Sequence, residues 1–286
     1  MVNVRITLLR AGSSSQLERL ARRGGRWRRI AFPATFALLE HPSRGALLFD
    51  TGYAPRFFEA TRPFPERLYR WLVPAAMGAD QDAATQLAAS GIGVAQVSTV
   101  VLSHLHGDHI GGLRDFPSAR LVASGIQDLR GATPGRRLRG RAALSATGHG
   151  FLPALLPDDF SSRCVPVEDL PVVATGLPGL AGGHDLLGDG SALAVPLPGH
   201  APGHLGLWVP LTQGPPVLLV GDACWLGETL GGDLPPAVVL RLMGDGGVYT
   251  HTIRLLERIR RERPDVWVVP SHSVASVAEA SAALGP

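Results

Sequence analysis

The segment from Ser103 to His109 reads Ser-His-Leu-His-Gly-Asp-His, and four of its side chains are potential metal ligands. Imidazole and carboxylate groups bind Zn²⁺ and related divalent ions. So dense a polar run is costly in a folded chain unless an ion compensates it. The spacing predicts two metal ions, one held by His104 and His106 and the other by Asp108 and His109, as in two-metal hydrolases. The alternative is an exposed polar loop.

Potential ligands also stand at the ends of three later predicted strands. Each follows an apolar run, where the loops of a rigid scaffold carry functional side chains. These candidates are His200 and His204 after 192–196, Asp222 after 217–220, and His272 after 266–269. A single histidine at such a place is usually structural. Three strand ends with suitable groups, following the dense first segment, favour one shared metal centre.

Alternation and apolar periodicity predict the elements that position these groups. We expect strands at Val4–Leu9, Thr35–Leu39, Ala46–Phe49, 97–103, Arg120–Ala123, Ala192–Pro196, Leu205–Val209, Val217–Val220 and 266–269. We expect helices over 55–73, 82–90, 249–262 and 275–283, with a short helix that ends at about 115. Two β-sheets with helices on both outer faces fit this order of elements.

Residues 125–185 are rich in glycine, proline and arginine and show weak periodicity. We interpret this segment as an irregular cap or insertion and not as a second domain. The length of 286 residues suits one large domain or two small ones. We therefore expect a single domain over 1–286, with the cap inserted in it.

The composition is that of an ordinary globular protein, with 45% hydrophobic and 18% charged residues. The apolar runs are strand-sized and the N-terminus reads as a strand, so we expect a cytoplasmic protein without a membrane span. The chain contains no lysine, which excludes Schiff-base chemistry. Arginines cluster at 19–29 and 130–141, either as a solvated surface or to attract an anionic substrate. We expect both cysteines, Cys164 and Cys224, to be reduced.

Taken together, these motifs resemble the metallo-β-lactamase superfamily of hydrolases. The segments that carry the resemblance are Phe-Asp-Thr-Gly at 49–52, His-Leu-His-Gly-Asp-His at 104–109, Pro-Gly-His-Ala-Pro-Gly-His at 198–204, Gly-Asp at 221–222 and Pro-Ser-His at 270–272. The likeness covers about residues 34–275, in the family's order. It implies an α/β (α+β) fold built as a four-layer αβ/βα sandwich. It also implies two divalent metal ions, which we expect to be Zn²⁺, with Mn, Fe or Co as alternatives.

The resemblance implies a role for each candidate side chain. One metal would be held by His104, His106 and His200, the other by Asp108, His109 and His272, with Asp222 bridging both. His204 would be structural or would support a ligand. Asp50 would hydrogen-bond the metal-binding loop, because partners of this kind orient metal ligands.

The implied reaction is hydrolysis of an ester, lactone or thioester by a metal-bridging hydroxide, with Asp108 taking or passing a proton. Aspartate at 222 resembles the lactonase-like and glyoxalase II-like branches. Similar lactonases place a tyrosine three residues later, where this chain has Trp225, which would be an apolar pocket wall or a core residue. The aromatic stretch with Phe57, Phe58 and Phe64 would form a lid over the substrate pocket, a packed helix or a homodimer surface.

Two rival functions stay open at this point. A phosphodiesterase or nuclease of the same superfamily would use the same ions and could exploit the arginine clusters. The chain has no recognisable RNA-binding arm or nuclease insertion, so we expect a small-molecule substrate and no nucleic-acid partner. The other rival is a catalytically silent metal-binding protein, and the intact ligand set argues against it.

Overall fold

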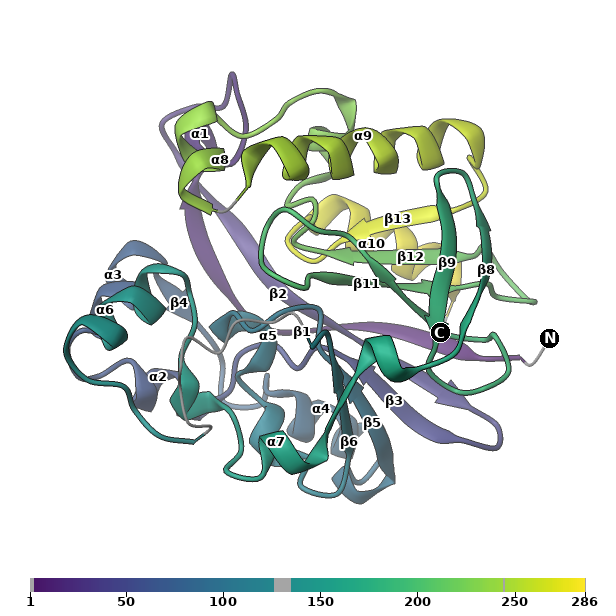
Figure 1. Ribbon diagram of the computed structural model, residues 1–286, viewed down its shortest axis with the longest axis horizontal. Helices are drawn as coiled ribbons and strands as arrows, with labels where there is room; N and C mark the ends of the chain where they lie inside the picture. Colours follow the sequence, from purple (N-terminus) through teal and green to yellow (C-terminus); the bar gives the residue numbers. More distant parts are fainter. Residues whose placement is uncertain (1–2, 126–134, 244, 286) are drawn as a thin grey trace.

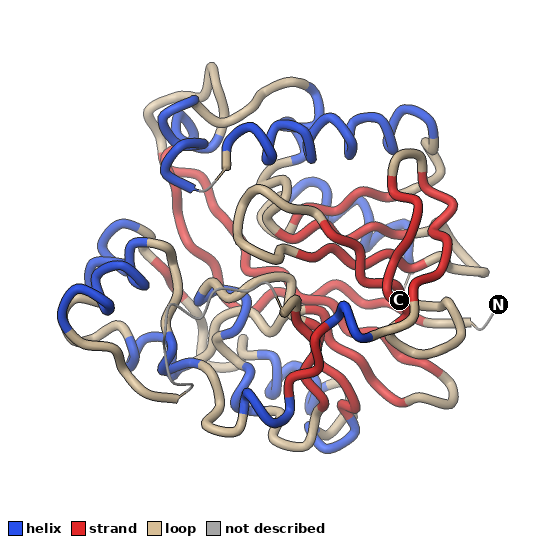
Figure 2. The backbone as a smooth tube through the Cα atoms, viewed as in Figure 1, coloured by secondary structure: helices blue, strands red, loops and turns tan. Residues whose placement is uncertain are grey.

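The computed structural model describes residues 3–125, 135–243 and 245–285, and it contains two β-sheets. The first sheet has the strand order β4 (Ala75–Ala76), β1 (Arg5–Leu17), β2 (Arg29–His41), β3 (Gly45–Phe49), β5 (Val97–Val101), β6 (Arg120–Ala123) and β7 (Cys164–Pro166). The second has the order β13 (Trp267–Pro270), β12 (Val217–Gly221), β11 (Leu205–Val209), β10 (Leu193–Pro196), β9 (Leu180–Asp185) and β8 (Val172–Leu177). The strands lie at the centre of the molecule with helices around them (Figure 2).

Strand direction changes within each sheet. Strands β1, β2 and β3 pair antiparallel, whereas β3, β5, β6 and β7 run parallel to their neighbours. In the second sheet β12 and β13 are parallel and the other pairs are antiparallel. Parallel neighbours end at the same edge of a sheet, so the loops that follow β3 and β5, and those that follow β12 and β13, begin side by side.

Helices cover the outer faces of the two sheets (Figure 1). On the side of the first sheet lie α2 (Pro55–Ala60), α3 (Arg67–Leu72), α4 (Ala83–Ala89), α5 (Gly107–Ile110), α6 (Gly140–Gly148) and α7 (Phe160–Arg163). The remaining helices are α1 (Glu18–Ala21), α8 (Ala237–Met243), α9 (Gly246–Glu262) and α10 (Val274–Leu284). Short 3-10 turns lie at Val94–Gln96, Leu113–Asp115, Pro153–Leu155, Val167–Asp169 and Gly227–Gly231.

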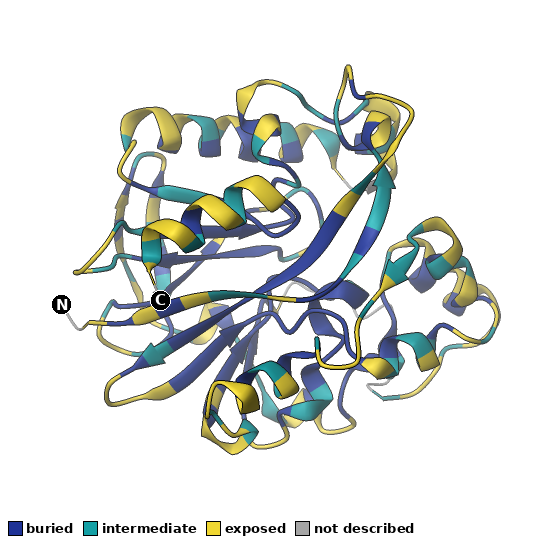
Figure 3. Cartoon of the chain, turned by 180° about the vertical axis from the view of Figure 1, so that it is seen from behind, coloured by how far each residue is buried: buried dark blue, intermediate teal, exposed yellow. Residues whose placement is uncertain are grey.

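Three apolar clusters separate these layers. The first packs the helices α2 to α7 on the first sheet, the second fills the space between the sheets, and the third packs α9 on the second sheet. Helix α9 buries Ile253, Leu256 and Ile259, which lie on one face at helical spacing. Figure 3 shows the buried strands between exposed outer helix faces. The layer order confirms the predicted αβ/βα sandwich, and because the sheets share one interior we propose a single domain.

The segment 125–185 is less irregular than the sequence predicts. Residues 126–134 lie outside the described part, but α6, α7 and three strands lie within the rest of it. Strand β7 extends the first sheet, and β8 and β9 form a hairpin at the edge of the second. The reason for the error is local: β7 has three residues, and β9 contains Gly182 and Gly183, which interrupt the apolar alternation.

The expected helix over 55–73 is divided into α2 and α3. Pro63 and Pro65 stand between the two pieces, and proline removes a backbone donor and clashes with the preceding turn of a helix. Separately, no helix in the described ranges is both long and apolar enough to cross a membrane.

Candidate metal centre

The loops after β3, β5, β10, β12 and β13 converge where the two sheets meet. The Leu205 N–H, at the start of β11, donates a 2.9 Å hydrogen bond to the Ser103 carbonyl, which ties the second sheet to the loop after β5. The Asp50 N–H donates to the Val101 carbonyl at 2.8 Å. The chemistry-bearing loops are therefore anchored to rigid strand ends.

The first group of potential ligands contains His104, His106, His200 and Asp222, with one ligand atom of each within 4.8 Å of the others. His200 Nε2 lies 3.1 Å from His106 Nδ1 and 3.3 Å from Asp222 Oδ2. The four side chains come from three separate loops and are buried or nearly so. Three imidazoles and a carboxylate around one point are a suitable set for a divalent cation.

The second group contains Asp108, His109 and His272, again with ligand atoms within 4.8 Å of one another. Asp222 links the two groups, because its Oδ1 lies 3.2 Å from His109 Nε2 and 3.0 Å from His272 Nε2. Its Oδ2 faces His200 of the first group. One carboxylate thus presents an oxygen to each cluster, which is the arrangement that two neighbouring ions require of a bridging ligand.

The protonation of the first group suits metal binding. Burial holds the pKa of His104 and of His200 well below the ordinary value, and neighbouring histidines lower the pKa of His104 further. Burial also lowers the pKa of His106. The His104 Nε2 atom is buried without a hydrogen-bond partner among the described residues. A neutral imidazole with an unused lone pair in a dry site is costly unless it meets a cation, so the residues fit a metal ion.

Carboxylates dominate the electrostatics of the second group. Burial alone would lower the pKa of His109, but Asp50, Asp222 and Asp108 outweigh it and raise that pKa well above the ordinary value. Asp222 has the same effect on the pKa of His272. Burial would raise the pKa of Asp222, yet the surrounding histidines, with His272 the strongest, hold it well below the usual range. The centre thus concentrates negative charge, which cations would neutralise.

Asp50 fixes the orientation of the metal-binding loop. Its Oδ1 accepts the Ser103 N–H at 2.8 Å, and its Oδ2 accepts the Ser103 hydroxyl at 2.7 Å. The same Oδ2 lies 2.7 Å from His109 Nδ1, so a proton on Nδ1 would be held by Asp50 and Nε2 would face the centre as a metal ligand. Asp50 has a φ of 61°, a left-handed conformation that turns the chain sharply after β3.

Asp222 and His272 are also supported by neighbouring residues, and the sequence indicates only some of these contacts. His204 accepts the Asp222 N–H through Nε2 at 3.1 Å, and burial lowers the pKa of His204 to about 3. His272 Nδ1 lies 2.8 Å from the Pro33 carbonyl, and Phe32 stacks on the His272 ring at 5.0 Å. No motif marks Phe32 or Pro33 in the sequence. They reach the centre because β2 lies beside the loop that follows β13.

Gly150 packs against His106. Its φ is +73°, and an added Cβ would lie 2.8 Å from Cδ2 and 3.0 Å from Nε2 of the His106 ring. We expect Gly150→Ala to displace this ligand and to lower kcat/KM roughly 10- to 100-fold, the range seen when a ligand loses its support. Steady-state hydrolysis and metal content would measure the effect. Gly176→Ala is the matched control, because Gly176 has a φ of +70° and no atom within 4 Å of an added Cβ. Equal activity in both variants would contradict the assigned role of Gly150.

A cavity of about 380 Å³ opens directly onto the metal centre. Its floor contains His106, Asp108, His200, Asp222 and His272. Its apolar walls and mouth come from Leu20, Ala21, Phe32, Leu72, Val73, Trp225, Val239 and Leu242. Trp225 lines the wall and also donates its indole N–H to Asp222 Oδ2 at 3.1 Å, so it holds the Asp222 carboxylate besides shaping the cavity.

Of the three alternatives for the aromatic stretch, the contacts of Phe57 and Phe58 support packing and not a lid over the substrate pocket. Phe57 is fully buried in the core beneath Gly107, Phe58 packs edge-on against Phe57, and neither lines the cavity at the metal centre. Phe64 is 65% exposed and lines a separate hollow beside Arg136 and Arg137. The part of the stretch that does reach the cavity is the end of α3, with Tyr69, Leu72 and Val73.

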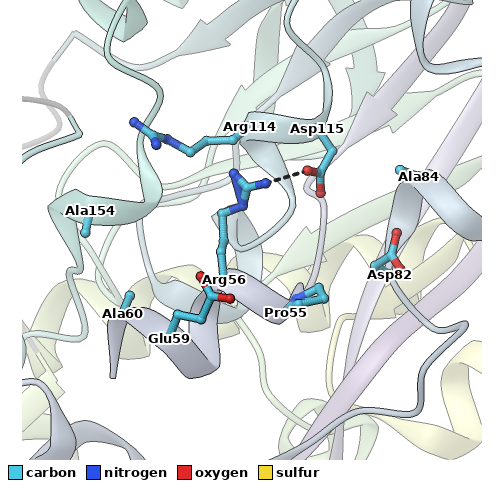
Figure 4. Close-up of a pocket in the computed structure, with 9 residues that line it drawn as sticks. All are labelled: Pro55, Arg56, Glu59, Ala60, Asp82, Ala84, Arg114, Asp115 and Ala154. Atoms are coloured by element: carbon cyan, nitrogen blue, oxygen red, sulfur yellow. Dashed lines mark hydrogen bonds and ion pairs between the residues drawn. The ribbon is translucent and has the colours of Figure 1, made fainter. Parts of the chain in front are cut away.

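A larger surface hollow of about 680 Å³ lies outside α2. Figure 4 shows Arg56 reaching Asp115, at 2.8 Å, with Glu59 and Asp82 nearby. It contains none of the predicted ligands. The arginine clusters also have internal partners: Arg22 and Arg28 pair with Glu18, and Arg137 pairs with Glu66. These pairs account for part of the clustered charge without an anionic substrate.

Neither cysteine takes part in the centre. Cys164, on β7, is free, and burial raises its pKa to about 11. Cys224 is free and fully buried, and burial raises its pKa strongly. Both thiols therefore stay protonated at neutral pH and behave as packing groups.

The comparisons with known proteins agree on one family. The model of the metallo-beta-lactamase superfamily matches residues 30–272. The N-acyl homoserine lactonase AttM of Azorhizobium caulinodans is 27% identical over 280 residues, which cover 95% of this chain and 94% of that protein. A probable metallo-hydrolase of Mycobacterium bovis is 30% identical over 247 residues, covering 82% of this chain and 73% of the relative.

Solved structures share the fold at low sequence identity. An N-acyl homoserine lactone hydrolase, with the product N-hexanoyl-L-homoserine at its catalytic metal centre, superposes with a TM-score of 0.71 at 18% identity. The match covers 98% of this chain and 96% of that one. The dizinc quorum-quenching lactonase AidC gives a TM-score of 0.61 at 14% identity, over 96% of this chain and 89% of that one.

Proposed function

The chain belongs to the metallo-beta-lactamase superfamily and is a metal-dependent hydrolase, and from this premise we propose that it opens lactone rings with two zinc ions. The proposed ligands are His104, His106 and His200 for one ion, Asp108, His109 and His272 for the other, and Asp222 for both. Support comes from the two convergent groups that Asp222 joins. The dizinc relative supports zinc, and elemental analysis would distinguish it from Mn, Fe or Co.

The protein's own residues prepare the reaction. Bound divalent ions would lower the pKa of a water molecule toward about 7 and polarise a carbonyl oxygen. Asp108 lies on the cavity floor, where its carboxylate can carry a proton to the ring oxygen that leaves. The new C–O bond forms at the carbonyl carbon first, the ring C–O bond then breaks, and the product is a hydroxy acid. Asp50 and Trp225 keep His109 and Asp222 in place.

One observation carries the choice of a lactone over a phosphodiester. The described side chains that line the cavity include no arginine, and more than half of those outside the proposed ligand set are apolar. Phosphodiester substrates are usually held by cationic side chains that form paired hydrogen bonds with phosphate. Largely apolar walls above a polar floor instead suit a small polar ring with an apolar substituent. Lactonases among the relatives support the same substrate class.

Assays with a zinc-loaded preparation would test this function. The substrates are N-acyl homoserine lactones with short and long acyl chains, an acyl thioester and a bis-aryl phosphate. We expect ring opening of the lactones, with the higher kcat/KM for the longer chain. Turnover of the phosphate alone would contradict the proposal, and turnover of none of them would favour the metal-binding alternative.

Leu72 provides a sharper test of how the substituent binds. It is 75% exposed at the end of α3 and lines the cavity. Leu72→Ser removes apolar surface that a long chain would cover, so we expect KM for the long-chain lactone to rise about tenfold. KM for the short-chain lactone should stay within about twofold. Leu144→Ser is the control, because Leu144 is 46% exposed and lines the separate hollow beside Phe64. An equal effect on both substrates would contradict this binding mode.

A further inference from the structure

Tyr69 brings a phenol hydroxyl to the metal centre from the helical side of the cavity. The side chain comes from α3, is 7% exposed and lines the cavity. Its ring packs edge-on against Phe57, with centroids 5.6 Å apart. The ring is therefore held by core packing, and its hydroxyl is delivered to a fixed place beside Asp108.

The contact of this hydroxyl with Asp108 is long. The Tyr69 hydroxyl lies 3.4 Å from Asp108 Oδ1, whereas hydroxyl hydrogen bonds are usually about 2.7–2.8 Å long. Asp108 Oδ2 is the oxygen that faces His272, at 3.6 Å. The hydroxyl thus meets the oxygen that points away from the other ligands. A phenol with an ordinary pKa of about 10 keeps its proton at neutral pH. The Tyr69 hydroxyl is therefore a hydrogen-bond donor, and its long hydrogen bond to Asp108 is weak.

The cavity lining also contains the hydroxyls of Ser14 and Thr147 and the amide of Gln16. Among the hydroxyls of the described lining residues, that of Tyr69 is the one within hydrogen-bond distance of a proposed metal ligand. Trp225 uses its indole N–H on Asp222, and no arginine is among the described lining residues. His149 lines the cavity, but its Nδ1 lies 2.8 Å from the Ser145 carbonyl within its own helix turn. Of these groups, Tyr69 combines burial, a fixed ring and an available proton.

We propose that Tyr69 is a catalytic residue whose hydroxyl donates a hydrogen bond to the substrate carbonyl oxygen as negative charge develops on it. This inference rests on the proposed lactone hydrolysis. As the water oxygen bonds to the carbonyl carbon, the carbonyl electron pair moves to the oxygen that Tyr69 contacts. Asp108 takes a proton from the attacking water. When the carbonyl re-forms, the ring C–O bond breaks and Asp108 gives that proton to the leaving oxygen. Tyr69 keeps its own proton throughout, because its O–H only rotates from Asp108 Oδ1 to the substrate oxygen while the ring stays in place.

Tyr69→Phe tests this role, because it removes the hydroxyl and keeps the ring that packs on Phe57. We expect kcat for lactone opening to fall about 10²- to 10³-fold, as for loss of an oxyanion donor. KM and the content of two zinc ions per chain should not change. Tyr53→Phe is the matched control: Tyr53 packs on the same ring with centroids 4.6 Å apart but does not line the cavity. It should retain wild-type kcat.

Two results would overturn the inference. An unchanged kcat in Tyr69→Phe would show that the hydroxyl does not act on the substrate. Loss of a zinc ion in this variant would show that Tyr69 only positions Asp108. Failure of the proposed function is a different outcome, because the wild-type protein itself would then open no lactone.

Discussion

Replacement of Asp222 by alanine should cost this protein more activity than any other single change in the centre. Asp222 faces both ligand groups, with Oδ2 3.3 Å from His200 Nε2 and Oδ1 3.0 Å from His272 Nε2. Without it, each ion loses a ligand and the two ions lose their shared anion. We expect zinc content to fall from two ions per chain to one or fewer. We expect kcat/KM to fall by at least about 10³-fold, beyond the 10- to 100-fold of a supporting contact.

Metal analysis and steady-state lactone hydrolysis on one preparation would measure both effects. Asp233→Ala is a suitable control, because Asp233 forms an ion pair with Arg22 outside the centre. Circular dichroism of the metal-free proteins would show that the fold is retained. A variant at 222 that kept two ions and normal turnover would refute the bridging assignment.

The second large effect is expected at Asp50, which does not contact the proposed metals. Asp50→Asn keeps the size of the side chain, and asparagine tolerates the left-handed backbone at φ 61°. The amide has a single acceptor oxygen, so it cannot accept from the Ser103 N–H, the Ser103 hydroxyl and His109 as the carboxylate does. We expect the zinc affinity of the Asp108–His109–His272 group and kcat/KM to fall roughly 10- to 100-fold.

Competition with a chelator would measure zinc affinity in this variant. Asp189→Asn is the matched control, because Asp189 also pairs with a histidine, His41, at 2.7 Å, but away from the centre. It should keep wild-type affinity and turnover. If Asp50→Asn matched it in both respects, the orientation of His109 would not depend on the carboxylate.

The positions of the proposed ligands could be predicted from the sequence because most of them follow the end of a strand. His104 follows β5, His200 follows β10, Asp222 follows β12 and His272 follows β13. A strand end fixes the start of a loop, and a short loop leaves its first polar side chains few directions. The fold was accessible for the same reason, since β6 and β11 begin and end where apolar alternation places them.

The cavity walls could not be predicted in this way. Tyr69, Leu72, Leu20 and Leu242 come from short helices whose positions depend on tertiary packing, and no spacing in the sequence links them. Phe57 was a candidate for the pocket wall because it is aromatic, but its ring packs beneath Gly107 in the core. Substrate selectivity therefore depends on the least predictable part of the chain.

The contacts that hold the proposed ligands in place could be predicted only in part. Asp50 belongs to a motif that could be recognised, whereas Phe32 and Pro33 touch His272 only because β2 lies beside the loop after β13. Trp225 stands three residues after Asp222, and the sequence indicates a pocket wall there. The indole hydrogen bond to Asp222 became visible only in the structure, since it depends on the rotation of both side chains.

Zinc titration of the metal-free protein, followed by proton release from lactone opening, tests the central claim most directly. If seven side chains hold two ions that act together, activity will rise until two equivalents of zinc are bound and then stay constant. A plateau at one equivalent, or full activity in the metal-free protein, would contradict the dinuclear account.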